Sequence, residues 1–568
     1  MRIQTQRKGA KTQRGKPQPK KKKKGTPPVV DNIGRMQTQP VTHGSVPNSF
    51  IHKHSASIIG VLSGFDRLRL RGTLRQLYGP QVMEAYLNAC HILIKDFGQL
   101  VERTTLAIKE KARALAAQAG RPFLFVPSSQ TSKEELVRRI AAKDQVTEGL
   151  IAILNAVEPC QSFRVVGNRQ TKMIELKVET RKCSHLYFYF EHARFGFMHL
   201  RLQTWFPFQV NICLNGRHWL ARQLDQAGVA YQKKENTFLR VADLGRAQAL
   251  LDQQLEMDWP KELGQLLRQV HPLGRQICRP LDLEYYWSAS ETEYATDVIF
   301  KDADSLARLY PSWVHHAMSS FSSPDVMRFL GRYVPVSTGK VWGQFEGEII
   351  SDSKRRTEGV RVKHSVNGNS IKFYDKQGSV LRVETTIVRP EEFRTYRKPE
   401  GRPKETKRWL PLRRGLADLP RRADISHRSN ERYLQALAAA SGTVPLFEWV
   451  QKTCQPVTKA GQRYRALNPW APEDGRLLEL INQGEFAING FRNRDMRAAY
   501  FKSRATEQES KRRTGWMGRR LRLLRAHGLI QKVSGTHRYI VTPKGRMTTT
   551  ALLAARKADV EQLTKMAA

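Results

Sequence analysis

The sequence predicts an α+β protein of several domains, in which a central body of antiparallel sheets and helices lies between a basic N-terminal arm and a helical C-terminal unit. Three observations support this fold class. The chain has 568 residues, of which 40% are hydrophobic and ten are tryptophan, enough for about three to four packed domains. Apolar and polar residues alternate through 163–214 and 360–388, which is typical of half-buried strands. Elsewhere apolar residues recur at three- and four-residue spacing, which is typical of amphipathic helices.

The charge of the chain predicts a polyanionic partner. The 96 Lys and Arg residues against 52 Asp and Glu residues give a net charge of +44. Nucleic acid is the favoured partner, with DNA preferred over RNA. A membrane is disfavoured, because the sequence has no run of eighteen apolar residues and its basic N-terminus lacks the apolar segment of a signal peptide. We therefore expect an intracellular protein, cytoplasmic or nucleoid-associated.

The six cysteines are scattered without a Cys-x-x-Cys pair. This spacing predicts neither a disulfide framework nor a zinc ribbon. We expect reduced core residues at Cys90, Cys160, Cys183, Cys213, Cys278 and Cys454.

Residues 1–48 are predicted to form a disordered basic arm. The first 25 residues hold eleven Lys or Arg and no acid, and they lack the apolar side chains that would offset the entropy of ordering. Such an arm binds nucleic-acid backbones without sequence preference, or acts only as a solubilising tail. Its candidate phosphate contacts are Lys20, Lys21, Lys22, Lys23 and Lys24.

Residues 49–270 are predicted to form an α/β domain with an antiparallel sheet. We expect two short strands in 57–74, helices in 82–119 and 132–157, a multi-stranded sheet in 163–214 and a helix in 217–226. Tyr187 and Tyr189 share one strand face in this sheet, and Arg201 lies on the next strand. A basic face with exposed tyrosines can stack single-stranded bases; the alternative is a core strand covered by a helix.

Residues 271–395 are predicted to form a second α/β region. A helical stretch in 292–330, broken at Pro311 and Pro324, precedes a three-stranded meander with strands at 360–366, 370–376 and 380–387. Strand pleating separates an apolar face from a polar face. The apolar face comprises Ile371, Phe373, Leu381, Val383 and Ile387, and the polar face comprises Lys372, Tyr374, Lys376, Arg382 and Glu384.

The polar face of the meander carries candidate catalytic residues, namely Tyr374, Asp375 and Glu384. Cations beside a tyrosine stabilise its phenolate, so Tyr374 could attack a phosphodiester while Lys372 and Arg382 neutralise the phosphoryl charge. Two non-catalytic roles for this face are open. Glu384 could pair with its cationic neighbours on a solvent face, or the face could bind a phosphate backbone only.

Residues 372–384 include the strings Tyr-Asp-Lys and Leu-Arg-Val-Glu, which resemble strands of the rolling-circle replication initiators of plasmids and filamentous phages. The resemblance implies a tyrosine that cuts one DNA strand with the help of a divalent metal. Many members of that family hold the metal with a His-hydrophobic-His motif. Here the His-x-His string is His52-Lys53-His54, which has a lysine in the middle.

A metal-dependent nuclease is a further possibility. The sequence has no P-loop, no Gly-x-Gly-x-x-Gly after a strand and no His-Glu-x-x-His motif. A nuclease site for Mg²⁺ or Mn²⁺ would need two or three acids to converge; otherwise these acids are surface residues. The candidate acids are Asp66, Glu158, Glu191, Asp297 and Asp375.

Residues 396–468 are predicted to be a basic connector with an alanine-rich helix at 430–440. The next segment, 469–548, is predicted to form three helices and a hairpin. Residues 549–568 are predicted to form a terminal helix or tail. The third helix of the segment 469–548 is expected at 509–527. It places Met517, Leu521 and Leu524 on one face, carries seven Lys or Arg and ends at Gly528. Strands at 529–533 and 537–541 follow.

The elements of 469–548 resemble the winged helix-turn-helix family of DNA-binding domains. The resemblance implies that the third helix enters the major groove and that the hairpin, or wing, touches the adjacent backbone. The groove-facing side chains would be among Arg512, Arg513, Arg519 and Arg520, with Arg538 at the base of the wing. The alternative is a winged helix that docks a protein.

Two function classes follow from these observations. The first is a DNA-binding protein of a mobile or replicating genetic element, an initiator or transposase-like protein, with or without strand cleavage. The second is an RNA-binding protein that wraps a structured RNA as a ribonucleoprotein.

Overall fold

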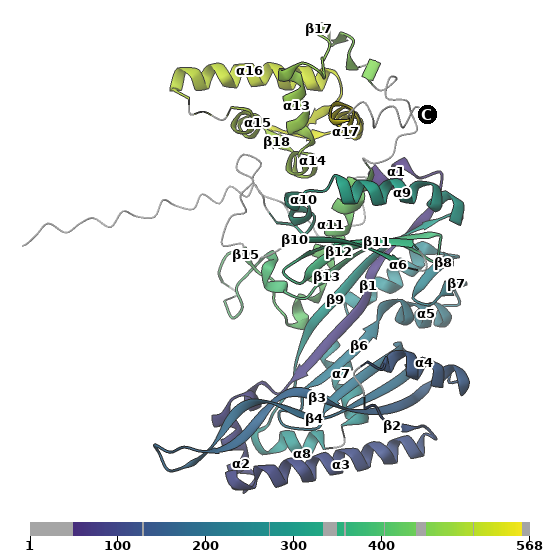
Figure 1. Ribbon diagram of the computed structural model, residues 1–568, viewed down its shortest axis with the longest axis vertical. Coiled ribbons are helices and arrows are strands. Elements are labelled where there is room, and N and C mark those ends of the chain that lie inside the picture. Colours follow the sequence, from purple (N-terminus) through teal and green to yellow (C-terminus); the bar gives the residue numbers. More distant parts are fainter. Residues whose placement is uncertain are drawn as a thin grey trace, which may run out of the picture. The chain divides into compact units, whose positions relative to one another are not determined.

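The computed structural model describes eleven stretches of the chain (Figure 1): residues 49–127, 130–271, 273–332, 349–356, 359–402, 404–438, 450–451, 453–501, 503, 505–534 and 536–558. The arm predicted for 1–48, including its five lysines at 20–24, lies outside the described residues. Within these stretches, no helix combines the length and apolar character that a membrane crossing requires.

One eleven-stranded sheet forms the core of the fold and confirms the α+β class with mainly antiparallel strands. The strand order is β10-β11-β12-β13-β9-β1-β6-β5-β4-β3-β2; among these described strands β2 and β3 are parallel neighbours and the other pairs are antiparallel. The strands are β1 Ile58–Thr73, β2 Phe123–Phe125, β3 Gly149–Gly167, β4 Ile174–His192, β5 Gly196–Gln203, β6 Val210–Asn215, β9 Tyr286–Phe300, β10 Ile349–Arg356, β11 Gly359–Val366, β12 Asn369–Lys376 and β13 Val380–Ile387.

Strand β1 joins the two halves of this sheet (Figure 1), pairing with β6 on one side and β9 on the other. Leu68 and Leu70 are buried, whereas Arg69 and Arg71 between and after them are exposed, as strand pleating requires. Because β6 lies in 49–270 and β9 in 271–395, the two regions that the sequence separated share one sheet.

Helices cover the sheet and enclose two apolar cores. The larger core lies between β1, β3–β6 and five helices: α2 Pro80–Ala89, α3 Phe97–Gln118, α5 Gly216–Gln226, α6 Leu244–Asp252 and α7 Trp259–Val270. The second lies between β9–β13 and three others: α9 Ala303–Ser319, α10 Ser323–Phe329 and α11 Leu419–Leu437. The remaining elements of this part are α1 Ser49–Lys53, α4 Lys133–Lys143, α8 Gly274–Cys278 and the hairpin of β7 Tyr231–Lys234 and β8 Thr237–Val241.

Helix α11 differs from the predicted connector. It begins at Leu419, contacts β9 and β13, and buries Arg422, Asn430 and Tyr433 completely. Two short strand pairs flank it in the chain: β14 Arg394–Arg397 with β15 Arg408–Pro411, and β16 Val457–Lys459 with β17 Gln462–Tyr464. The helix is therefore part of the core.

Three further predictions are wrong in detail. Residues 57–74 form one long strand rather than two. Residues 149–157, predicted to be helical, begin β3, and residues 292–300, also predicted to be helical, end β9. All of 292–300 is buried, so these residues lack the alternation that identifies a half-exposed strand.

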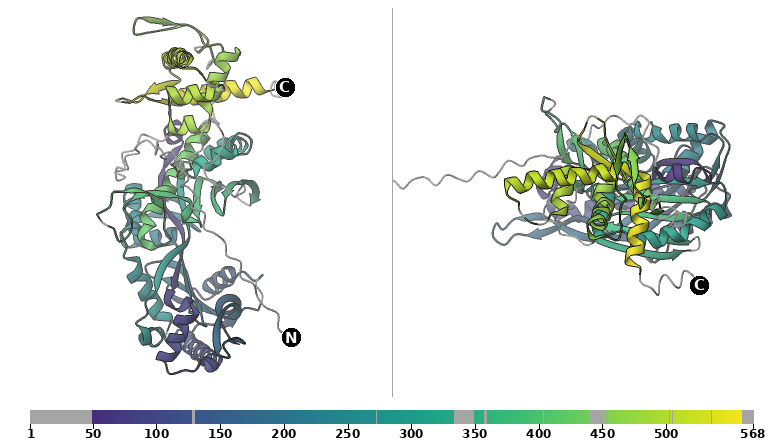
Figure 2. Two further views of the ribbon diagram at one scale, coloured as in Figure 1. Left: turned by 90° about the vertical axis from the view of Figure 1, so that its left-hand side faces the viewer. Right: turned by 90° about the horizontal axis from the view of Figure 1, so that it is seen from above.

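The C-terminal unit, 472–557, has its own apolar core. Its helices are α13 Pro472–Asn482, α14 Gly484–Asn489, α15 Asn493–Tyr500, α16 Glu507–Ala526 and α17 Pro543–Lys557, and its sheet has the order β18-β20-β19 with strands Phe491–Arg492, Arg538–Val541 and Ile530–Lys532. The three predicted helices and two predicted strands are present, and α14 occupies a segment where a break was expected. Figure 2 shows that α17 crosses α16 rather than running alongside it.

Candidate functional site

Arg382 on β13 lies in the middle of the sheet and is fully buried. Its partner across the strands, Asp297 on β9, accepts hydrogen bonds from Nε at 2.5 Å and from Nη2 at 2.9 Å. Asp66 on β1 accepts a bond from Nη1 at 3.2 Å. The prediction that Arg382 contacts phosphate is therefore wrong, because carboxylates of the protein itself occupy its donors.

A second buried arginine holds Asp297. Arg217, in the first turn of α5, donates from Nε to Asp297 at 3.0 Å and from Nη2 to the carbonyl oxygen of Ala295 at 3.1 Å. Burial alone would raise the pKa of Asp297, but Arg382 and Arg217 outweigh burial and lower it. Asp297 is thus an ionised anchor between two arginines.

Asp66, Glu293 and Glu384 form a buried carboxylate cluster on the neighbouring strands β1, β9 and β13. Oxygen atoms of the three side chains lie within 4.8 Å of one another. The register of β1 on β9 shifts between Phe65 and Arg67, so Asp66 sits at a bulge, which re-aims a side chain out of the regular ladder. Three such oxygen ligands suit a divalent cation of the Mg²⁺ or Mn²⁺ class.

The carboxylate cluster is also paired with cations of the protein. Arg67 donates to Glu293 at 3.0 and 3.1 Å, and Nζ of Lys372 lies 2.7 Å from Glu384. Together with Asp297 the cluster forms a network of four carboxylates and four cations, the latter being Arg67, Arg217, Lys372 and Arg382. A bound metal ion would therefore replace some of these internal contacts.

The carboxyl group of Glu384 has a raised pKa. Burial raises its pKa to about 7; Lys372 opposes this rise, whereas Glu293 and Asp66 add to it. A carboxyl group with a pKa near neutrality releases a proton when a cation binds, which couples cation binding to pH.

Tyr374 does not have the environment that the sequence predicted. Its hydroxyl donates to Glu384 at 3.0 Å, and burial together with Glu384 raises its pKa well above the ordinary value. The prediction of a stabilised phenolate is wrong, because burial and Glu384 raise the pKa of Tyr374 more than Arg382 lowers it. Asp375 accepts a hydrogen bond from the backbone of Gly378 at 2.9 Å, in the turn after β12, and is not part of the carboxylate cluster.

The His-x-His string also lies in a different setting. The ring of His54 packs against Phe50 and Trp313, with centroids 4.9 and 5.4 Å apart, in the second apolar core. Burial, with a smaller effect of Lys53, lowers the pKa of His54 to about 4. His54 is thus a packed core residue.

A cavity of about 450 Å³ opens beside Asp66, between α4, β5, β6 and the β7–β8 hairpin. Asn236 of that hairpin donates to both oxygens of Asp66, at 3.0 and 3.1 Å. His199 and His218 also line the cavity, and burial lowers their pKa values to about 4 and about 3, so both rings are neutral near pH 7. The charged lining residues are Asp66, Arg67, Arg69, Glu134, Arg138 and Glu235.

The predicted base-stacking platform is a covered surface. Tyr189 is 2% exposed and packs in a small core that includes Val137 of α4. Tyr187 donates to Glu158 at 2.7 and 2.9 Å, and Arg201 binds the same carboxylate at 2.8 and 3.0 Å. Of the two alternatives, the core strand covered by a helix is the one present, because α4 covers this strand face; Tyr187 and Tyr189 are not an exposed platform.

The other predicted acids do not converge. Burial would raise the pKa of Glu158, but Tyr187, Arg201 and Lys133 lower it to about 2. Glu191 pairs with Arg222 at 2.8 Å. Sequence reasoning missed Glu293, because its strand was predicted to be a helix, and it missed Arg217 and Asn236, for which the sequence offers no signal.

Helix α16 carries the predicted groove-facing arginines, which fall into two groups. Arg512 and Arg519 are exposed and form no hydrogen bond or ion pair within the described stretches. Arg513 instead bonds Ser503 and Glu509, and Arg520 lies 2.8 Å from Glu473 with its guanidinium over Trp516. Arg538 is half-buried on β20.

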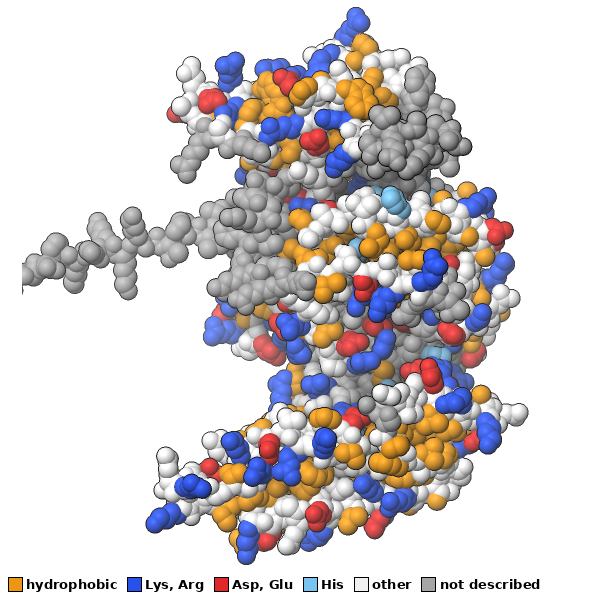
Figure 3. Space-filling view, in the orientation of Figure 1, with side chains coloured by type: hydrophobic (Ala, Val, Ile, Leu, Met, Phe, Trp, Pro, Cys, Tyr) orange, Lys and Arg blue, Asp and Glu red, His pale blue; other side chains and the backbone are white. Residues whose placement is uncertain are grey.

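The basic side chains on the face drawn in Figure 3 do not form one cluster. Figure 3 shows Lys and Arg scattered among acidic and hydrophobic side chains on this face, without a single large basic patch. The distribution of charge therefore does not mark a binding surface on this face. No family model, curated protein sequence or solved structure matches this chain.

Proposed function

We propose that this chain binds nucleic acid, DNA in preference to RNA, and that its C-terminal unit is a winged helix that makes the primary contact. The element order supports this proposal: α13, α15 and α16 precede the β19–β20 hairpin, and the sheet order is β18-β20-β19. In a winged helix, the third helix and the hairpin face the DNA.

The row of free arginines on α16 is the observation that carries the proposal. Arg512, Arg519 and Arg522 are exposed, and their spacings of seven and three residues place them on one helix face. No acidic partner neutralises them within the described residues. Like charges gathered on one face repel one another, and this repulsion is relieved when phosphates bind.

A role on a mobile or replicating element, as an initiator or transposase-like protein, is the biological setting that we propose for this DNA binding. An RNA-binding protein is the weaker alternative. An aromatic sheet for stacking bases was one part of its support, together with the basic arm and connector, and α4 covers Tyr189 and its neighbours.

The binding test compares two double variants that change the charge equally. Arg512→Ala with Arg519→Ala removes the free pair on α16, whereas Arg103→Ala with Arg139→Ala removes two exposed arginines on α3 and α4. We expect the first variant to weaken duplex DNA binding by about 1–3 kcal/mol per base contact, or to reduce the salt slope by about one per phosphate contact. Fluorescence anisotropy at several salt concentrations measures both quantities; equal losses in the two variants would contradict the proposal.

Metal-dependent strand cleavage is a second candidate function, and the carboxylate cluster beside the cavity is the observation that favours it. Asp66, Glu293 and Glu384 would hold Mg²⁺ or Mn²⁺, and Arg67 and Arg69 in the cavity wall would bind the phosphate. The balanced network of internal ion pairs is the competing explanation, since it needs no metal.

Incubation of labelled single-stranded and duplex DNA with each metal distinguishes these explanations. If the cluster cleaves DNA, Glu293→Gln abolishes cleavage, whereas Glu102→Gln retains it, because Glu102 is an exposed residue of α3 outside the cluster and the cavity wall. Tyr374→Phe should also retain cleavage. A covalent adduct that disappears in Tyr374→Phe would point to a tyrosine nickase, and no cleavage with either metal would leave a binding protein.

A further inference from the structure

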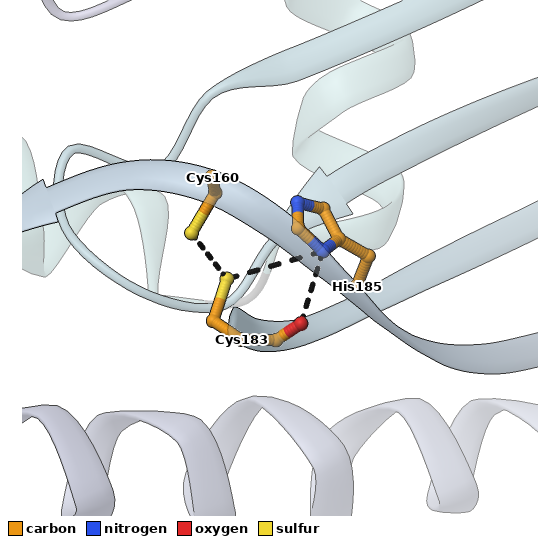
Figure 4. A group of neighbouring side chains, drawn as sticks. All are labelled: Cys160, Cys183 and His185. Atoms are coloured by element: carbon orange, nitrogen blue, oxygen red, sulfur yellow. Dashed lines mark hydrogen bonds between the residues drawn. The ribbon is translucent and has the colours of Figure 1, made fainter. Parts of the chain in front are cut away.

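A second group of ligand-type side chains lies on the β3–β4 hairpin, outside the carboxylate cluster (Figure 4). Cys160 is on β3, and Cys183 and His185 lie two residues apart on β4, so both point to the same face. The register pairs Cys160 with Arg181 and Cys183 with Glu158, which makes the cysteines diagonal neighbours across the hairpin. Their sulfur atoms are 2.7 Å apart, and one ligand atom of each side chain lies within 4.8 Å of the others.

The position and hydrogen bonding of His185 are those of a metal ligand. It is fully buried, and one of its ring nitrogens lies within 4.8 Å of the two sulfur atoms. Nδ1 lies 3.2 Å from the carbonyl oxygen of Cys183. A proton on Nδ1 is donated to this carbonyl and leaves a lone pair on Nε2, which is the arrangement typical of metal-binding histidines. Nε2 is buried and has no hydrogen-bond partner within the described part of the chain.

We propose that Cys160, Cys183 and His185 bind one Zn²⁺ ion. Two thiolates and a neutral imidazole are ligands that Zn²⁺ prefers, and the two thiolate charges balance the charge of the ion. The neighbouring Arg201 is neutralised by Glu158 and therefore does not repel the ion strongly. Three protein ligands leave a fourth position for water or another small ligand.

The 2.7 Å between the sulfur atoms lies between the distance expected for bound zinc and that of a disulfide. Tetrahedral zinc with Zn–S bonds of about 2.3 Å holds two sulfur atoms about 3.8 Å apart, so Cys160 and Cys183 would separate by roughly 1 Å. A disulfide would need the sulfur atoms to approach to about 2.05 Å. It would also leave His185 without a role and its Nε2 without a partner, which is why we favour the metal.

The test measures metal in the full chain, purified without chelators from zinc-supplemented cells. We expect about one zinc per chain, lost in Cys160→Ser and in Cys183→Ser. Cys213→Ser is the matched control, because Cys213 is a thiol on β6 outside the cluster, and it should keep the metal.

Cobalt titration of the metal-stripped wild-type chain does not depend on the folding of a variant. We expect a sulfur-to-cobalt absorption band in the wild-type chain, and a changed cobalt spectrum in His185→Gln. Absence of both zinc and the cobalt band in folded wild-type protein would overturn the proposal. Recovery of a Cys160–Cys183 disulfide from freshly prepared, air-protected protein would also overturn it. DNA binding enters none of these measurements, so they stand apart from the proposed function.

Discussion

Arg382 is the residue of the central sheet whose substitution we expect to lower stability most. It is fully buried and bonded to Asp297 and Asp66. Its removal leaves the buried carboxylate of Asp66 without its cationic partner and leaves Asp297 paired with Arg217 alone. We expect Arg382→Met to lower the free energy of unfolding by about 3–5 kcal/mol, as measured by urea denaturation.

Arg69→Met is the control for this experiment. Arg69 pairs with Glu291 at 3.3 Å on the surface, where an ion pair contributes about 0–1 kcal/mol. Similar losses in the two variants would mean that burial does not govern the strength of the Arg382 network.

The sequence predicted the faces of single strands but not the partners across strands. Alternation placed Ile371, Phe373 and Val383 on the apolar face of the meander, and all three are fully buried. The same alternation put Tyr374 and Glu384 together, and their hydrogen bond confirms this. It could not place Asp66 or Glu293 beside them, because these residues are supplied by strands far away in the sequence.

At the scale of elements, the start of α5 depends on a glycine. A β-carbon on Gly216 would lie 1.8 Å from the carbonyl oxygen of Phe65 on β1. This close approach of α5 to β1 positions the next residue, Arg217, to donate a hydrogen bond to Asp297. Gly216→Ala should therefore push α5 away from β1 and lower the free energy of unfolding by about 1–3 kcal/mol or more.

For Gly98→Ala, in the first turn of α3, we expect the opposite effect on stability. Nothing lies within 4 Å of the added carbon there, so the substitution should stabilise the protein by about 0.5–1 kcal/mol through the helix preference of alanine. Thermal unfolding of both variants measures the contrast. A stabilised Gly216→Ala would show that α5 can shift without cost.

Helix α16 allows a separate stability prediction. Gly515 is exposed in the middle of this helix, and the nearest atom to an added β-carbon is 3.9 Å away. Gly515→Ala should raise the free energy of unfolding of the C-terminal unit by about 0.5–1 kcal/mol. If DNA binding weakens at the same time, the helix backbone approaches the nucleic acid at this glycine.

Local pattern was enough for the C-terminal unit and insufficient for the central sheet. In α16, Met517, Leu521 and Leu524 recur on one face, and all three are fully buried as predicted. In β9, residues 292–300 are buried on both faces, so no pattern separates strand from helix. The helix α11 was predicted as a connector because its charged residues concealed that Arg422 and Asn430 are core residues.

At the scale of the whole molecule, buried histidines make folding sensitive to acid. Burial is the largest cause of the lowered pKa values, from 6.5 to about 3–4, of six histidines that we do not assign to the zinc site: His54, His199, His218, His271, His316 and His364. Between pH 6.5 and 4 the unfolded chain binds protons that the folded chain excludes. The stability that these six neutral histidines contribute is therefore fully present above pH 6.5 and is lost as the pH falls towards 4.

We expect urea denaturation to give a smaller free energy of unfolding at pH 5 than at pH 7. The raised pKa of Glu384 acts in the opposite direction, since the folded chain then holds one proton that the unfolded chain releases above pH 4.5. This single group cannot offset six histidines. Equal stability at the two pH values would show that the histidines titrate normally in the folded protein.

The pairing of β1 with β9 has a consequence for synthesis of the chain. Arg67 and Glu293 are 226 residues apart, yet they bond across adjacent strands. At about 5–20 residues per second, a ribosome needs roughly 11–45 s to deliver the second strand after the first. During that interval β1 has an open backbone edge, so the nascent chain is expected to depend on chaperones or on slow post-translational completion of the sheet.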